Sequence, residues 1–195
     1  QLKVIDMDKN SVITFFNERA PEWDDELIRN DGVINTILDI AGVNENSSVL
    51  DVACGTGVLF DDYLKRKVSS IDAIDISDEM VKSAKVKYPE INVICGDAEE
   101  YCFNKAFDCI VIYNAFPHFI NERKLFENLT RFLKKGGRLT VAHGMSREAI
   151  LKCHSGKASH ISKELPSISA LAQIMGGFVE VDVTISNDEM YVVSG

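Results

Sequence analysis

The chain has 195 residues, 46% of them hydrophobic and 26% charged, which predicts one globular domain with a full core. Its formal net charge of -9 argues against nucleic acid and against an anionic membrane surface as partners. No apolar run approaches the roughly 18 residues of a membrane span, and the N-terminal stretch has no apolar signal region. The cysteines form no Cys-x-x-Cys pair. We therefore expect a cytoplasmic protein.

Predicted strands and helices alternate along the chain after a helical N-terminal cap (1–45). Apolar runs typical of parallel strands buried on both faces lie at 49–53, 71–75, 91–95, 107–113 and 137–143. Two more runs, at 178–186 and 189–194, are joined by a tight Ser-Asn-Asp-Glu turn, which predicts a terminal helix and antiparallel hairpin over 165–195. This alternation predicts an α/β, doubly wound sheet in a single domain (1–195).

Capping residues and charge order mark the ends of two helices. Ser77 is a good N-cap for a helix with acids in its first turn and lysines in its last turn, before Pro89. Another helix begins near Glu122 and has apolar residues at a spacing of three to four through Leu133. The pair Gly136-Gly137 is predicted to end it.

The first three predicted strands carry an acid at or just beyond their carboxyl ends, where open parallel sheets bind ligands: Asp51, Asp75 and Asp97. Asp75 lies 18 residues after Gly57, a spacing at which an acid accepts hydrogen bonds from both ribose hydroxyls. Asp97, one strand further out, is placed to receive an exocyclic amine such as that of adenine. A helix N-cap or a solvated loop explains any one of these acids, whereas three in succession indicate a bound adenosine.

The glycine loop after the first strand indicates which adenosine compound binds. Gly55 and Gly57 suit a ligand that approaches the bare backbone closely. The third glycine of the dinucleotide pattern G-x-G-x-x-G is replaced by Phe60, and no Gly-Lys-Ser/Thr follows as in a phosphate-binding loop. Asp51 would repel a phosphate but suits an ammonium or sulfonium group. The loop therefore favours an adenosine ligand without a pyrophosphate.

Five motifs follow one another between residues 49 and 143: "VLDVACGTG", "IDAIDIS", "GDAEE", "FDCIVIYNAFPHF" and "LKKGGRLTVAH". In this order they resemble the motifs of class I S-adenosylmethionine-dependent methyltransferases, of the small-molecule type. The resemblance implies S-adenosyl-L-methionine as cofactor and a mostly parallel, seven-stranded Rossmann-like sheet with an antiparallel last strand. It implies that the glycine loop contacts the methionine part, Asp75 the ribose and Asp97 the adenine. In this cofactor-binding core (46–143), the predicted cofactor-binding residues are Asp51, Ala53, Gly55, Gly57, Asp75, Ile76, Met80, Asp97, Ala98 and Asn114.

The methyl acceptor is predicted to be a small molecule held by residues outside these motifs. His118 and His143 follow or end the fourth and fifth strands, and each is a candidate general base. For His118 the alternative is a packing residue that shapes the cofactor pocket. Phe16 and Trp23 either stack on a ligand or anchor the N-terminal cap.

The segment 144–164 is locally basic and is predicted to lie on the substrate side. If 146–154 is a helix, Arg147 and His154 share one of its faces. This arrangement fits either an anionic acceptor or an ordinary solvated surface. The spacing of histidines and cysteines fits no zinc pattern, so no metal is expected.

Two other classes of function stay open at this point. One is an NAD(P)-linked oxidoreductase on a Rossmann sheet, against which Phe60 and Asp51 both argue. The other is a non-catalytic, cofactor-binding domain. The sequence carries no signal for the acceptor atom (O, N, S or C) or for the oligomeric state.

Overall fold

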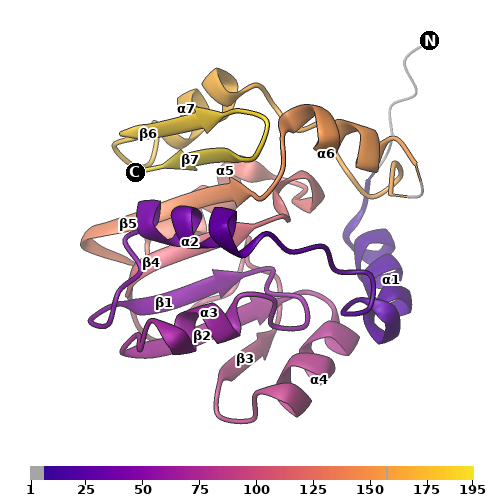
Figure 1. The fold of residues 1–195 in the computed structure, drawn as a ribbon, viewed down its shortest axis with the longest axis horizontal. Helices are drawn as coiled ribbons and strands as arrows, with labels where there is room; N and C mark the ends of the chain where they lie inside the picture. Colours follow the sequence, from indigo (N-terminus) through magenta and orange to yellow (C-terminus); the bar gives the residue numbers. More distant parts are fainter. Residues whose placement is uncertain (1–6, 157) are drawn as a thin grey trace.

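The structure, a computed structural model, describes residues 7–156 and 158–195, and in these residues seven strands form one sheet (Figure 1). The order of the strands across the sheet is β3-β2-β1-β4-β5-β7-β6. Their bounds are β1 Ser48–Val52, β2 Ser70–Asp75, β3 Asn92–Cys95, β4 Phe107–Tyr113, β5 Leu133–His143, β6 Val183–Ser186 and β7 Tyr191–Ser194. β1 to β5 pair in parallel, and β7 is antiparallel to both of its neighbours. The predicted α/β sheet with an antiparallel last strand is confirmed.

Helices connect most of the strands, as expected from the sequence, but β3 is followed by β4 with no helix between them. The bounds of the helices are α1 Lys9–Arg19, η1 Ala20–Glu22, α2 Asp31–Ile40, α3 Phe60–Lys65, α4 Asp78–Lys87, η2 Phe116–His118, α5 Glu122–Thr130, α6 Arg147–His154 and α7 Ile168–Met175. The side chain of Ser77 caps α4, as predicted, by accepting a hydrogen bond from Met80 N at 3.1 Å. None of the helices in the described part of the chain is long and apolar enough to cross a membrane.

Helices cover both faces of the sheet, which explains why its central strands are apolar along their length. On one face, α2, α3 and α4 pack over side chains such as Val49 and Val111. On the other face, α5, α6 and α7 pack over Leu50 and Ile112, which point the opposite way because side chains alternate along a strand. In Figure 1, α2 and α3 lie in front of the sheet.

The helix α5 is shorter than predicted. It ends at Thr130, and Leu133 already begins β5, where it pairs with Phe107 of β4. The apolar spacing that suggested a longer helix is also satisfied by a strand. Phe132 packs edge-on against Phe103 (ring centroids 5.2 Å apart), and both Phe132 and Leu133 lie against the same core cluster.

The terminal hairpin is present, but its first strand begins later than predicted. Asn187 N donates to Met190 O across the turn (3.0 Å). β6 begins at Val183 rather than at residue 178, because the end of α7 continues into this stretch: Phe178 N donates to Met175 O at 2.9 Å.

The N-terminal segment divides into two parts with different positions. α2 packs on the sheet, where Val33 and Ile37 share a core cluster with Ala142 and Val192. α1 stands beside the edge to which the parallel strands point, and it packs against α4 (Figure 1). Among the described residues before β1, α1 and the segment between it and α2 therefore lie where they can cover a ligand at the strand ends.

Candidate active site

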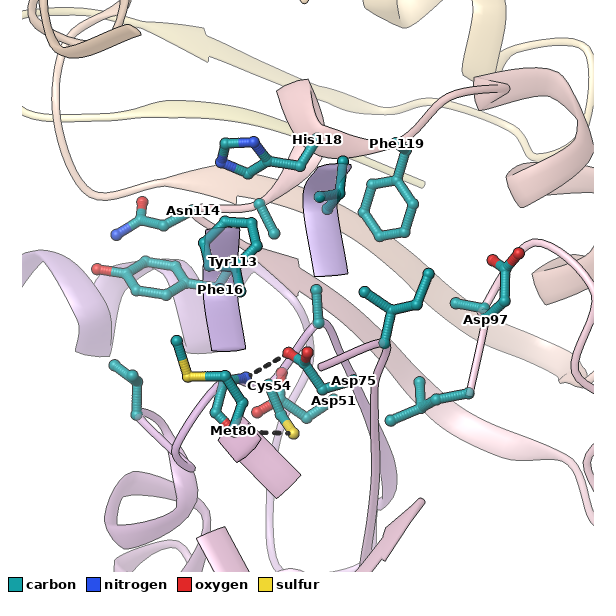
Figure 2. Close-up of a pocket in the computed structure, with 18 of the residues that line it drawn as sticks. Phe16, Asp51, Cys54, Asp75, Met80, Asp97, Tyr113, Asn114, His118 and Phe119 are labelled. Carbon is teal, nitrogen blue, oxygen red and sulfur yellow. Dashed lines mark hydrogen bonds between the residues drawn. The ribbon is translucent and has the colours of Figure 1, made fainter. Parts of the chain in front are cut away.

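One cavity lies at the carboxyl ends of β1 to β4 and is covered by α1 and the following turn (Figure 2). Most of the residues predicted to bind the cofactor line it: Asp51, Ala53, Gly55, Asp75, Ile76, Met80, Asp97, Ala98 and Asn114. Phe16, Trp23 and His118 line it as well. Strand ends that are far apart in the sequence thus form one pocket, as the position of the three acids indicated.

Asp75 is held by two backbone N–H groups at the end of β2. One carboxylate oxygen accepts from Gly55 N at 2.8 Å (dashed in Figure 2), and the other accepts from Ser77 N at 2.9 Å. Burial raises the pKa of Asp75 despite these hydrogen bonds. The carboxylate is therefore fixed in orientation while it faces the cavity.

Asp51 is the second acid of the pocket and is 2% exposed. Burial, together with the nearby charge of Asp75, raises its pKa well above the usual range. Figure 2 shows the two carboxyl groups close together below Phe16. Two buried acids at this spacing are stabilised in their charged form by a cation, so this part of the cavity suits a positively charged ligand group.

Asp97 marks the far end of the cavity, beyond β3. It is ion-paired with Lys9 of α1, whose ammonium also lies 3.2 Å from a carboxylate oxygen of Glu99. The other oxygen of Glu99 accepts from the backbone N–H groups of Ile120 and Asn121, both at 2.9 Å. Lys9 thereby joins α1 to the end of β3, a contact that no sequence pattern indicated.

The two glycines of the loop have different roles. Gly55 has a positive φ of 56°, and a Cβ built on it would point toward Trp23 Nε1 (3.7 Å) and Met80 Sδ (4.0 Å) across the cavity. Gly57, which was also predicted to bind the cofactor, is not among the residues that line the cavity. A Cβ at Gly57, where φ is 89°, would lie 2.6 Å from the ring of Phe60. A Cβ at Gly57 would thus collide with a packed ring, whereas a Cβ at Gly55 would lie at van der Waals distance from Trp23 and Met80, which line the cavity.

Two polar residues of the N-terminal segment bind the loops that form the cavity. The side-chain oxygen of Asn17 accepts from Ser77 Oγ at 2.6 Å, directly beside Asp75. Asp24 accepts from Thr56 Oγ1 at 2.5 Å, within the glycine loop. With the ion pair of Lys9, the segment is tied to the ends of β1, β2 and β3.

The end of the cavity next to β4 is lined by aromatic rings. The ring of Phe16 stands edge-on to those of Trp23 and His118, with centroids 5.7 and 5.0 Å apart. His118 Nδ1 lies 2.9 Å from the carbonyl oxygen of Ile161, and burial lowers the pKa of His118 to about 4. His118 is therefore a neutral imidazole at the cavity wall.

His143 lies behind the cavity wall rather than on it. It is 2% exposed, and its ring stands edge-on to Tyr191 at 6.0 Å. Nε2 has no hydrogen-bond partner among the described residues, and burial lowers the pKa of His143 to about 3. A general base must reach the acceptor, and His143 is not among the residues that line the cavity.

The residues predicted to meet an anionic acceptor also lie outside the cavity. Arg147 Nε donates to the carbonyl oxygens of Leu165 (3.0 Å) and Pro166 (3.1 Å), and its Nη2 pairs with Glu164. His154 stands behind His118, with ring centroids 5.2 Å apart. Arg147 thus anchors the chain after α6.

Within residues 7–156 and 158–195, no three His, Cys, Asp or Glu side chains gather in an arrangement that could bind a metal ion.

His143 makes the fold sensitive to acid. Because its pKa is lower in the folded than in the unfolded chain, the unfolded chain binds the proton first as the pH falls below about 6.5. Between pH 6.5 and 4.5, the wild type should lose roughly 2 kcal/mol more unfolding free energy than His143→Asn, measured by urea titration at each pH. The exposed His160 gives the control: His160→Asn should follow the wild-type curve. If the unfolding free energies of the wild type and of His143→Asn fall by the same amount between pH 6.5 and 4.5, the prediction is wrong.

The strand order and the three edge acids define the class of protein: a Rossmann-like α/β fold that presents an adenosine-type site. Comparison with known proteins shows what the chain is similar to. Residues 49–137 match the family described as "Methyltransferase domain". A demethylmenaquinone methyltransferase of Paenarthrobacter aurescens is 29% identical over 174 residues, which is 82% of this chain and 65% of that protein. A malonyl-[acyl-carrier protein] O-methyltransferase of Ilyobacter polytropus is 32% identical over 67% of this chain and 52% of its own length.

Solved structures share the fold over nearly the whole chain. The DhpI–SAH complex superposes with a TM-score of 0.74 at 16% identity and covers 95% of both chains. YcgJ of Bacillus subtilis superposes with a TM-score of 0.64 at 20% identity, over 78% of this chain and 69% of its own. Residues 49–137 are thus similar to a methyltransferase domain, and the chain shares the fold of these solved structures. It spans about half to two thirds of the length of the curated relatives named above.

Proposed function

We propose that this protein transfers a methyl group from S-adenosyl-L-methionine to a small-molecule acceptor. The observation that carries the proposal is the pocket that joins Asp51, Asp75 and Asp97 at successive strand ends. Asp75 would hold the ribose hydroxyls, and Asp97 lies one strand further, where the adenine amine would be. The negative charge of the chain and its cysteine pattern support a cytoplasmic enzyme that does not act on nucleic acid.

The residues present fit the cofactor. Without a side chain, Gly55 leaves open the space in front of Met80 and Trp23, where the methionine part would lie. Asp51 and Asp75, whose pKa values are raised by burial, would be stabilised as anions by the cofactor's ammonium and sulfonium charges. When bound, S-adenosyl-L-methionine supplies an electrophilic methyl carbon on a sulfonium.

The protein's own contribution is then to orient the acceptor and to exclude water. Phe16 and Trp23 cover the cavity from α1 and the turn after it, and the links of Asn17 and Asp24 hold this cover on the cofactor loops. His118 is the polar side chain best placed to contact the acceptor from β4. Such positioning in a dry pocket accelerates a bimolecular transfer without a covalent intermediate on the protein.

Calorimetric titration with S-adenosylhomocysteine and with NADH tests the proposal. We expect one S-adenosylhomocysteine per chain to bind and NADH not to bind. Binding of NADH without S-adenosylhomocysteine would favour the oxidoreductase instead. Binding of S-adenosylhomocysteine with no transfer of labelled methyl to a broad panel of acceptors would favour a non-catalytic domain.

A further inference from the structure

The cavity has an end that the three acids assigned to the cofactor leave free. In the sheet, β4 lies next to β1 on the side away from β2 and β3, so these acids stand at three of the four strand ends, and Asn114 alone of the predicted cofactor-binding residues lies at the fourth. Tyr113, Asn114 and His118 line the cavity after β4, and Phe16 faces them from α1 (Figure 2). The methyl acceptor must occupy this end.

This end of the cavity offers no partner for a negative charge. Among the described residues, Lys9 is the only cationic side chain that lines the cavity, and it is paired with Asp97 and Glu99 at the opposite end. Arg147 is bound to backbone carbonyls outside. An acceptor carboxylate at this end would therefore lose its hydration without gaining a cationic side chain as its counter-ion, which is unfavourable.

His118 offers one hydrogen-bond acceptor at this end. A carbonyl oxygen can only accept, so the 2.9 Å contact with Ile161 places the imidazole proton on Nδ1. Nε2 then carries a lone pair. Figure 2 shows this nitrogen on the edge of the ring that faces Asn114, away from the backbone of η2. A ligand hydroxyl fits such a nitrogen, whereas an ether or a carboxylate does not.

Resting on the function proposed above, we infer that the acceptor is an uncharged aromatic molecule whose hydroxyl group donates a hydrogen bond to His118 Nε2. The rings of Phe16 and His118 stand edge-on to each other, at 5.0 Å, and offer flat faces and edges to a planar ligand. On this side the cavity is lined by neutral rings, by the lone pair of His118 Nε2 and by the uncharged polar side chains of Tyr113 and Asn114. This acceptor class differs from the anionic acceptor that the basic segment 144–164 suggested.

Three naphthalenes of similar size test the proposal by calorimetry on protein saturated with S-adenosylhomocysteine. 2-Naphthol is neutral and has a hydroxyl, 2-naphthoate is an anion, and 2-methoxynaphthalene has no O–H to donate. We expect 2-naphthol to bind at least tenfold more tightly than 2-naphthoate and about fivefold more tightly than the methyl ether. Tighter binding of 2-naphthoate would overturn the proposal.

The variant His118→Phe keeps an aromatic ring and removes the lone pair. It should abolish the fivefold preference for 2-naphthol over the ether and keep the preference over 2-naphthoate. His160→Phe, at an exposed histidine, should keep both preferences. If His118→Phe keeps the fivefold preference, Nε2 is not the contact. Failure of S-adenosylhomocysteine to saturate the wild type counts against the proposed function itself, whereas saturation with the wrong ligand order counts against the acceptor class alone.

Discussion

Asp75→Asn is expected to weaken the binding of S-adenosylhomocysteine roughly 100-fold, measured by calorimetry. The carboxylate would accept two hydrogen bonds from the ribose hydroxyls, and each charge-assisted bond contributes about 1.5–3 kcal/mol. In addition, an amide has a single acceptor oxygen, so it cannot receive the N–H groups of both Gly55 and Ser77. The glycine loop then loses one of the contacts that hold it at the end of β2.

The fold should survive this substitution. Burial already raises the pKa of Asp75, which means that the folded chain gains little from its negative charge. We expect a melting temperature within a few degrees of the wild type. Asp72→Asn is the matched control, because Asp72 is also a buried acid of β2 but binds Asn92 Nδ2 (2.7 Å) and Lys105 instead of facing the cavity. It should leave the affinity unchanged; equal losses in both variants would remove Asp75 from the site.

The cofactor half of the pocket could be predicted because its residues follow directly from the positions of strands. Asp75 directly ends an apolar run, Asp97 follows one closely, and parallel strands bring their carboxyl ends to one edge. No further knowledge of packing is needed to place such acids together. The sequence pattern does not distinguish the roles of Gly55 and Gly57, because both belong to the same Gly-Thr-Gly loop. The difference between them depends on packing: a Cβ at Gly57 would collide with the ring of Phe60.

Contacts across long sequence distances could not be predicted in this way. Lys9 meets Asp97, 88 residues further along the chain, and a lysine at the start of a polar helix has no pattern that distinguishes an ion pair from a solvated end. In α6 the spacing of Arg147, Ile150 and His154 on one face is correct. The direction of that face is not encoded in the spacing, and the burial of Ile150 turns the face toward the core rather than toward the cavity.

Gly55→Val should abolish measurable binding of S-adenosylhomocysteine. Its φ of 56° is a conformation that β-branched residues rarely adopt, and the new methyl groups would fill the space in front of Trp23 and Met80. Backbone strain alone would lower the unfolding free energy by about 1–2 kcal/mol, which is too little to unfold the chain.

Gly136→Val separates the two effects. Gly136 has a similar φ of 76°, and a Cβ built on it meets no atom within 4 Å, so it carries the backbone strain without any ligand nearby. Both variants should lose similar amounts of stability in urea titrations, and only Gly55→Val should lose the cofactor. If both bind S-adenosylhomocysteine as the wild type does, Gly55 serves the turn and the methionine part lies elsewhere. If both lose it, strain rather than space controls binding.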